Sequence, residues 1–307
     1  MKAPNPLIGC LLALWMLSAG AQMAPLGNKA YLPEMYNPVP ADKRTGSYMV
    51  ALLREGWEFP GGFLCGASIV ADGWVLTAAH CLFDSNCKKL QFTDLYAIGG
   101  GLPLMPGLPR MNATAVRPHP GFRCMPFEEM IAAFNAGQPI PMGNDIGLVR
   151  VEGIKVSEPA LIVAKDGAAS AAPLVASGWG TLGNGAGISS KLNSVSLTVV
   201  STSTCVQAWY PSTLSPDQLC VGPPKLSPLA GVCSGDSGGP LVATLDFNRV
   251  QAGLVSLGHL VCNVVDRPSL FTNVLTHRPW IESNVGVGKL ADGSKTCTKA
   301  MEAAGIC

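Results

Sequence analysis

Charged residues are scarce in this sequence, and their scarcity argues against several classes of protein. Asp, Glu, Lys and Arg together make up 13% of the 307 residues, about half the usual share of a soluble domain. The formal net charge is only +1, so the sequence offers no electrostatic basis for binding nucleic acid or an anionic membrane surface. We therefore expect neither a nucleic-acid partner nor a membrane partner.

The sequence also lacks the patterns that structural metal sites require. It holds only four histidines, and none of its 11 cysteines form the Cys-x-x-Cys spacing of zinc sites. We therefore predict neither a bound metal nor a cofactor. If Cys10 is removed with the N-terminal apolar segment, ten cysteines remain. An even number suits five disulfides formed in an oxidising compartment.

The apolar run at the N-terminus is too short to span a bilayer, which takes about 20 residues. It covers residues 7–17 and is followed by the small residues Ser18–Ala21, a pattern typical of a secretory signal peptide. We predict a signal peptide over residues 1–21 and a secreted protein, or a periplasmic one if the source is bacterial. The alternative is a bacterial lipoprotein box at residues 7–10. In such a box the apolar run precedes the cysteine, whereas here most of it follows Cys10.

Glycine (35 residues) and proline (25 residues) are plentiful and show no fixed period, which favours many short strands joined by turns. Short runs rich in Val, Ile, Leu and Thr have the length of strands. They lie at residues 48–53, 66–81, 145–151, 191–200, 239–245 and 251–258. One late helix is predicted at 278–285, where Pro279 suits a first helical turn.

This pattern predicts an all-β body, which two barrels would satisfy, closed by the late helix. We place the body at residues 48–285. Residues 22–47 are rich in Pro and Ala and are expected to form an extended arm or a propeptide, and residues 286–307 a C-terminal extension.

Acyl transfer at a serine needs a base, a group that orients the base, and N–H donors for the developing oxyanion. Ser237 lies in "GVCSGDSGGPL" (231–241), which taken alone could equally be a glycine-rich turn. His80 follows an apolar strand in "VLTAAHCL" and stands beside a cysteine that could hold it in place. His119 lies between prolines and is expected in a surface loop. Taken singly, each histidine is more often structural than catalytic.

Three segments together resemble the trypsin/chymotrypsin family of serine endopeptidases. "WVLTAAHC" (74–81), "NDIGLVRV" (144–151) and "GDSGGPL" (235–241) are similar to that family's histidine, aspartate and serine boxes, in its order. Further similar segments lie at residues 63–69, 117–122, 177–182, 218–222 and 268–274. The resemblance covers residues 47–285. It implies two six-stranded antiparallel β-barrels and a C-terminal helix, with the active site in the cleft between the barrels.

The resemblance also implies a role for each residue that matches the family's motifs. Ser237 would attack the scissile carbonyl, His80 would accept its proton, and Asp145 would orient the imidazole. The backbone N–H groups of Gly235 and Ser237 would form the oxyanion hole. Ser256 matches the position that supports the buried aspartate.

The same match implies a pairing of the cysteines. It gives the pairs Cys65–Cys81, Cys205–Cys220 and Cys233–Cys262, and it leaves Cys87–Cys124 and Cys297–Cys307 as the remaining two.

In this family the residue six before the nucleophile forms the floor of the specificity pocket, and here it is Gly231. A Lys or Arg side chain would be buried there without a partner for its charge, at a large desolvation cost. The resemblance assigns Ser256, Leu257 and Gly258 to the pocket neck, with Leu257 where tryptophan is usual, and Ser269 where glycine is common. We therefore expect cleavage after uncharged, medium or large apolar residues. Asp266 is an open alternative, because a small shift of alignment would place its carboxylate in the pocket.

The sequence departs from the family pattern also in the segment where zymogens of the family are cut for activation. Family zymogens are cut before an Ile-Val-Gly-Gly-like start, and the new amine pairs with the aspartate before the nucleophile, here Asp236. No such start occurs near residues 35–37, where it would be expected. Either a different N-terminus or an internal cation would have to pair with Asp236.

The sequence leaves three functions open. The first is a secreted, monomeric endopeptidase acting on proteins or peptides, with proteinaceous inhibitors as further partners. The second is a catalytically silent homologue that serves as a binding or regulatory module. The third is an esterase using the same mechanism.

Overall fold

The computed structural model of the chain describes residues 39–101, 103–141, 143–156, 161–164, 173–183, 185–223, 230–245, 248–258, 262 and 268–291. The predicted signal peptide, Cys10, Asp266 and the Cys297–Cys307 pair lie outside these residues. Within them, no helix is both long enough and apolar enough to cross a membrane.

The first half of the described chain forms a closed barrel with the strand order β2-β3-β4-β7-β6-β5. Its strands are β2 (Met49–Arg54), β3 (Phe63–Ala71), β4 (Trp74–Thr77), β5 (Leu95–Gly99), β6 (Met111–Pro118) and β7 (Gly147–Val151). All neighbours pair antiparallel. The β3–β4 turn contains Gly73, whose φ of +76° lies in the left-handed region that glycine adopts without strain.

The second half forms another six-stranded ring, in the order β9-β10-β11-β14-β13-β12 and back to β9. Its strands are β9 (Leu174–Gly178), β10 (Asn193–Val199), β11 (Gln218–Gly222), β12 (Pro240–Leu245), β13 (Asn248–Leu257) and β14 (Ser269–Asn273). Two short strands join this ring from outside: β1 (Val39–Pro40) pairs antiparallel with β10, and β8 (Leu161–Val163) pairs parallel with β13. The prediction of two six-stranded barrels is confirmed.

The helices are only partly as predicted. The C-terminal helix α4 spans Val274–Val285, so it begins four residues before the predicted 278, and Pro279 lies inside it. The start is set by Asn273, whose side chain accepts a hydrogen bond from the Leu275 N–H at 3.1 Å. Three further helices were not predicted: α1 (Lys43–Tyr48), α2 (Phe127–Asn135) and α3 (Thr202–Trp209). Each has six to nine residues, too few to show a clear helical period.

The segment expected to be an extended arm is ordered structure from Val39 onward. Strand β1 pairs with β10, and helix α1 begins after Asp42, whose carboxylate accepts the Thr45 N–H at 2.7 Å. Arg249 of β13 binds the same turn, with 2.7 Å to the Asp42 carboxylate and 2.8 Å to the Thr45 hydroxyl. Residues 39–47 therefore pack on the second barrel rather than extending away from it.

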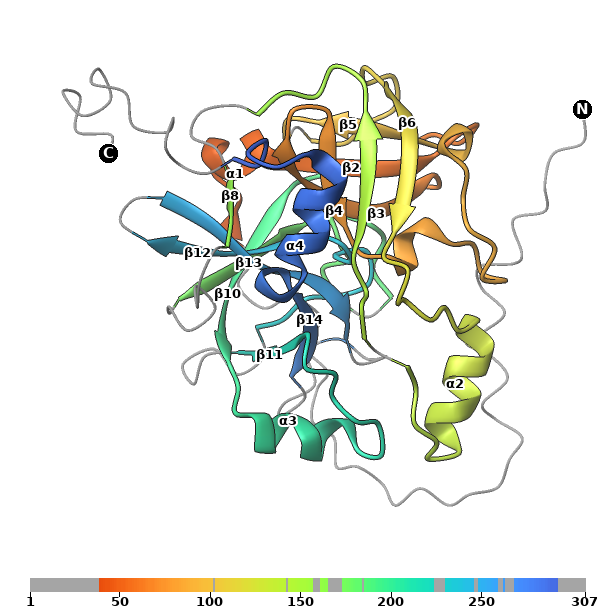
Figure 1. Cartoon of the computed structure of the whole chain (residues 1–307). Helices are drawn as coiled ribbons and strands as arrows, with labels where there is room; N and C mark the ends of the chain where they lie inside the picture. The colour runs from red at the N-terminus through yellow and green to blue at the C-terminus, as the bar shows by residue number, and fades with distance from the viewer. Residues whose placement is uncertain are drawn as a thin grey trace, which may run out of the picture. The chain divides into compact units, whose positions relative to one another are not determined.

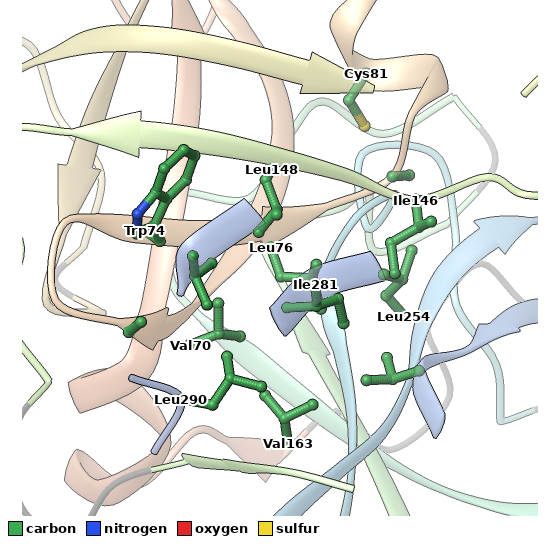
Figure 2. Packing of buried hydrophobic residues seen from close by; sticks show 14 of the residues in the cluster. Val70, Trp74, Leu76, Cys81, Ile146, Leu148, Val163, Leu254, Ile281 and Leu290 are labelled. Atoms are coloured by element: carbon green, nitrogen blue, oxygen red, sulfur yellow. The ribbon is translucent and has the colours of Figure 1, made fainter. Parts of the chain in front are cut away.

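Helix α4 follows the second barrel in sequence and packs against strands of both barrels (Figure 1). Figure 2 shows Ile281 among Val70, Leu76 and Leu148 of the first barrel, with Leu254 of β13 close by. All of these side chains are fully buried. The helix therefore ties the two barrels together and fixes the interface in which the candidate site lies.

Candidate active site

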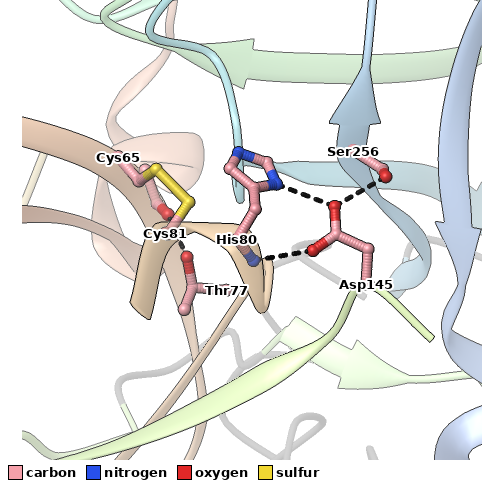
Figure 3. The surroundings of a disulfide bond; sticks show 7 residues. Cys65, Thr77, His80, Cys81, Asp145 and Ser256 are labelled. Carbon is pink, nitrogen blue, oxygen red and sulfur yellow. Dashed lines mark hydrogen bonds and ion pairs between the residues drawn. A yellow bond between two sulfur atoms is a disulfide. The ribbon is translucent and has the colours of Figure 1, made fainter. Parts of the chain in front are cut away.

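His80 is held at the end of a strand by covalent and hydrogen bonds. It begins a single 3₁₀ turn, His80–Leu82, just after β4. The Cys65–Cys81 disulfide joins this turn to β3, and the Thr77 hydroxyl donates to the Gly66 carbonyl at 2.8 Å. Figure 3 shows these groups around the imidazole. The backbone is thus attached to the barrel both before His80, at Thr77, and after it, at Cys81.

Asp145 accepts hydrogen bonds on both of its carboxylate oxygens. Oδ1 accepts the backbone N–H of His80 at 2.8 Å, and Oδ2 lies 2.8 Å from His80 Nδ1. The Ser256 hydroxyl also donates to Oδ2, at 2.7 Å (Figure 3). The contact expected between Ser256 and the buried aspartate is confirmed. Because Nδ1 faces a carboxylate, Nε2 is the ring nitrogen left to accept a proton.

The pair also sets the protonation of both groups. Burial lowers the pKa of His80, but the charge and hydrogen bond of Asp145 outweigh that effect and hold the pKa above its usual value of 6.5. Burial raises the pKa of Asp145, but the charge of His80 and the hydrogen bonds of His80 and Ser256 outweigh it. The Asp145 pKa therefore lies below its usual value, and Asp145 is ionised at neutral pH.

Ser237 lies in a tight loop that is bonded to the first barrel. Its carbonyl accepts the Gly66 N–H at 2.9 Å, and Gly238 after it has a φ of +75°. The N–H groups of Asp236, Gly238 and Gly239 all donate within the fold. Among the described residues, those of Gly235 and Ser237 donate to no acceptor. These two N–H groups are therefore available to an oxygen of a bound substrate.

A pocket of about 450 Å³ brings several of the sequence-predicted residues together. His80, Asp145 and Ser237 all line it, although no hydrogen bond among the described residues joins the His80 and Ser237 side chains. Ser256, Leu257 and Gly258 line it as well.

Two residues expected in the specificity pocket do not line this cavity. Gly231 is half-buried between the buried residues Ala230 and Val232, and Ser269 lies beside Gly258. A Cβ on Gly258 would lie 3.8 Å from the Ser269 hydroxyl, so Ser269 adjoins the pocket neck without lining the cavity.

Much of the pocket wall comes from residues that the sequence analysis did not identify. The segment between β6 and β7 supplies Phe122, Arg123, Cys124, Met125, Phe127, Met130 and Pro141, and the loop after His80 supplies Phe83, Asp84 and Ser85. The Cys87–Cys124 disulfide joins these two segments. The spacing of Phe127, Met130 and Phe134 is helical and could have indicated an apolar helix face here.

Asp236 is buried and held by backbone groups. Its carboxylate accepts the Gly180 N–H and the Cys233 N–H, each at 2.9 Å. Burial outweighs these bonds and raises the pKa of Asp236 to about 6. No ion pair reaches Asp236 from the part of the chain that the structure describes. The source of a cationic partner, left open by the sequence, stays open.

Four of the five expected disulfides are present: Cys65–Cys81, Cys87–Cys124, Cys205–Cys220 and Cys233–Cys262. The Sγ atoms of Cys65 and Cys81 lie within 4.8 Å of a His80 nitrogen, but both are oxidised in their disulfide. They therefore offer no thiolate to a metal ion.

His119 lies in a loop directly after β6, as predicted, but it is less exposed than a surface loop residue. It is half-buried, and its ring centre lies 5.0 Å from those of His277 and Trp280 on α4. The cause is the position of α4, which packs over the end of β6. His277 is itself buried and binds Asp217 at 3.0 Å.

Comparison with known proteins agrees with this geometry. The chain matches the protein-family model described as Trypsin over residues 36–281. It is 34% identical over 225 residues to chymotrypsin-2 of Vespa crabro, covering 72% of this chain and 88% of that protein. It is 28% identical over 284 residues to granzyme M of Homo sapiens, covering 90% and 95%.

A solved structure has the same fold. Neuropsin, described as a serine protease expressed in the limbic system of mouse brain, aligns with a TM-score of 0.62 at 24% identity. The alignment covers 81% of this chain and 99% of neuropsin. Two barrels, a C-terminal helix and a histidine–aspartate pair between them define a serine protease domain of the chymotrypsin fold.

This chain belongs to the trypsin family. It spans only 28% and 54% of the length of two longer relatives that it also matches.

Proposed function

We propose that this protein is a secreted endopeptidase that hydrolyses peptide bonds through an acyl-enzyme at Ser237. The observation that carries the proposal is the His80–Asp145 pair, bonded at 2.8 Å, in a pocket that Ser237 also lines. His80 takes the Ser237 proton through Nε2 as Ser237 attacks the scissile carbonyl, and then gives it to the leaving amine. The ionised Asp145 stabilises the imidazolium that forms in between.

The oxyanion that forms during the attack needs hydrogen-bond donors that are already in place. The N–H groups of Gly235 and Ser237 fit this role, because the neighbouring N–H groups are used within the fold and these two are not. Loss of one such donor typically costs about 10²–10³ in kcat.

The pocket favours apolar substrate side chains. Phe83, Phe122, Met125, Met130 and Leu257 all line it. Gly231 does not line this cavity, but the family resemblance assigns it to the floor of the specificity pocket, where it has no side chain that could pair with a basic residue. Two acidic side chains, Asp84 and Asp145, also line it, but Asp145 is already bonded to His80 and Ser256. The proposal is therefore cleavage after uncharged apolar residues.

The first test is labelling with a fluorophosphonate probe. Native, processed protein should react, and Ser237→Ala should not, since the probe needs an activated serine. No reaction of the native protein would support a silent binding module instead. Because an esterase would also react, hydrolysis of a peptide substrate completes the test.

The second test is a peptide library. Cleavage should follow apolar residues in the native protein. Gly231→Asp tests the floor position that the family resemblance assigns to residue 231: a carboxylate there should add cleavage after Lys or Arg by supplying a buried counter-charge. Cleavage confined to Lys and Arg bonds in the native protein would contradict the apolar preference.

Secretion is supported by the disulfides. Four are present in the described residues, and such bonds persist in oxidising compartments. The predicted signal peptide at residues 1–21 would direct the chain there. Recovery of the disulfide-bonded protein outside the cell, beginning after Ala21 or later, is the measurement that checks this.

A further inference from the structure

A second histidine–aspartate pair lies behind the candidate catalytic pair. Asp217, just before β11, and His277 of α4 are both buried, and His277 Nε2 donates to Asp217 Oδ2 at 3.0 Å. Neither residue lines the pocket around Ser237. The function proposed above gives this buried pair no role.

Asp217 also binds the residue that precedes Asp145. The same Oδ2 accepts the backbone N–H of Asn144 at 2.7 Å. Asn144 has a φ of +57°, in the left-handed region that non-glycine residues rarely adopt. A backbone in this conformation needs strong contacts to hold it, and a buried carboxylate accepting the N–H is such a contact.

Other groups hold the rest of this short turn. The Thr272 hydroxyl donates to the Asp145 carbonyl at 2.8 Å, and the His119 N–H donates to the Ile146 carbonyl at 2.9 Å. Of all the side chains that hold this turn, Asp217 is the charged one. Its Oδ1 accepts a hydrogen bond from the Ser215 hydroxyl. The turn is therefore fixed residue by residue, from 144 to 146.

The charge of Asp217 is stable in its buried position. Burial raises its pKa, but the hydrogen bonds from His277, Ser215 and the Asn144 N–H outweigh that effect, and the pKa falls to about 2. His277 is the largest of these favourable contributions. The His277 side chain therefore keeps a carboxylate ionised at the point where it binds the Asn144 N–H.

We propose that Asp217 and His277 are positioning residues for the catalytic aspartate. By holding the Asn144 N–H they fix the turn from which Asp145 directs its carboxylate to His80 and Ser256. This inference rests on the proposed function, because it concerns the same triad. It predicts that loss of Asp217 loosens the His80–Asp145 hydrogen bond without changing any residue that touches the substrate.

The test uses two readouts in the full, disulfide-bonded chain. The first is kcat and KM on an apolar peptide: Asp217→Ala should lower kcat about 10–100-fold with KM within about twofold, because orientation of the base is lost while substrate contacts remain. The kcat of His277→Ala should lie between that of Asp217→Ala and that of the native protein. His277→Gln, which keeps an N–H donor, should recover most of the loss.

The second readout does not depend on activity. In the Ser237→Ala background, NMR titration of the His80 ring should give a lower pKa when Asp217→Ala is added, by about half a unit or more, because Asp145 is no longer held against the imidazole. If the native protein has no activity but this shift occurs, the proposed function fails and the positioning role stands.

The control is Leu197→Ala, a cavity in the core of the second barrel. It should lower the melting temperature without moving the His80 pKa or kcat. An unchanged kcat and an unchanged His80 pKa in folded Asp217→Ala would overturn the inference. Equal losses of kcat in Asp217→Ala and Leu197→Ala at equal melting temperature would also overturn it, since they would make the effect one of stability.

Discussion

Asp236 is the residue whose environment conflicts most with carrying a charge. It is 1% exposed and is bound by two backbone N–H groups rather than by a cation from the described residues. A Cβ added to Gly180 would lie 2.5 Å from the carboxylate, so glycine lets the backbone approach it this closely. Asp236 therefore ionises only with difficulty until a cation pairs with it.

This environment predicts how Asp236 affects stability at different pH. Its folded pKa of about 6 lies above its usual value of 3.8, so the folded state holds the proton more tightly than the unfolded state does. Its contribution to stability is therefore greatest at low pH and falls as the pH rises from about 4 to above 6, by about 3 kcal/mol in total. Unfolding of full-length Ser237→Ala with and without Asp236→Asn, at pH 4–8, isolates this slope.

Asp217 provides a matched comparison when the same unfolding measurement is extended from pH 4 down to pH 2. Its folded pKa of about 2 lies below 3.8, so the stability it contributes is present above pH 3.8 and is lost as the pH falls toward 2. The two aspartates should thus give slopes of opposite sign. If the difference in unfolding free energy between Ser237→Ala with and without Asp236→Asn does not change with pH, a cation already pairs with Asp236.

At the scale of elements, helix α2 contributes exposed apolar side chains to the wall of the pocket. None of its residues is buried, yet Phe127 and Met130 line the pocket, and Phe127 is 54% exposed. Met130 and Phe134 also line a smaller recess with Trp209 and Leu257. Exposed apolar side chains beside a pocket favour a ligand that covers them.

We therefore predict that α2 contributes to substrate binding and not to the chemical step. Met130→Ala should raise KM for peptides rich in apolar residues about 5-fold, because roughly 1 kcal/mol of apolar contact is lost. The value of kcat should change little. Ala132→Ser, on the exposed side of the same helix, is the control. A fall in kcat at constant KM for Met130→Ala would contradict this role.

At the scale of the whole molecule, helix α4 couples the two barrels. Ile281 is fully buried in a cluster that contains residues from both barrels, including Trp74 and Leu254. Since the candidate site draws His80 and Asp145 from the first barrel and Ser237 and Ser256 from the second, its geometry depends on this coupling.

Ile281→Ala should destabilise the protein by about 2–5 kcal/mol through lost burial and a cavity. Both barrels should still unfold in one transition, at a lower denaturant concentration, because the cluster is shared. Denaturation followed by tryptophan fluorescence and by residual peptidase activity measures this. Val287→Ala, at a position that is 88% exposed, should have no effect. Two separate transitions in the native protein would contradict the coupling.

Several strands could be predicted from short apolar runs, but β5 and β6 lie outside those runs, and the helices were predicted less well still. Runs such as 239–245 and 251–258 are short, apolar and bounded by Gly or Pro, and they correspond to β12 and part of β13. The residues around His80, Asp145 and Ser237 were recognised because each lies in a short contiguous motif. Helix α4 was placed four residues too late, since its first turn is defined by an asparagine cap and not by apolar spacing.

The sequence by itself indicated an all-β body through its short apolar runs. Through compact motifs that resemble the trypsin/chymotrypsin family, it also implied the two barrels, the cysteine pairs and the residues of the candidate triad. Only the tertiary structure decided what surrounds them. The wall that α2 adds to the pocket and the bond from Asp217 to Asn144, 73 residues apart, are both long-range contacts. Such contacts depend on how barrels, loops and helices pack, and no local pattern in the chain records that packing.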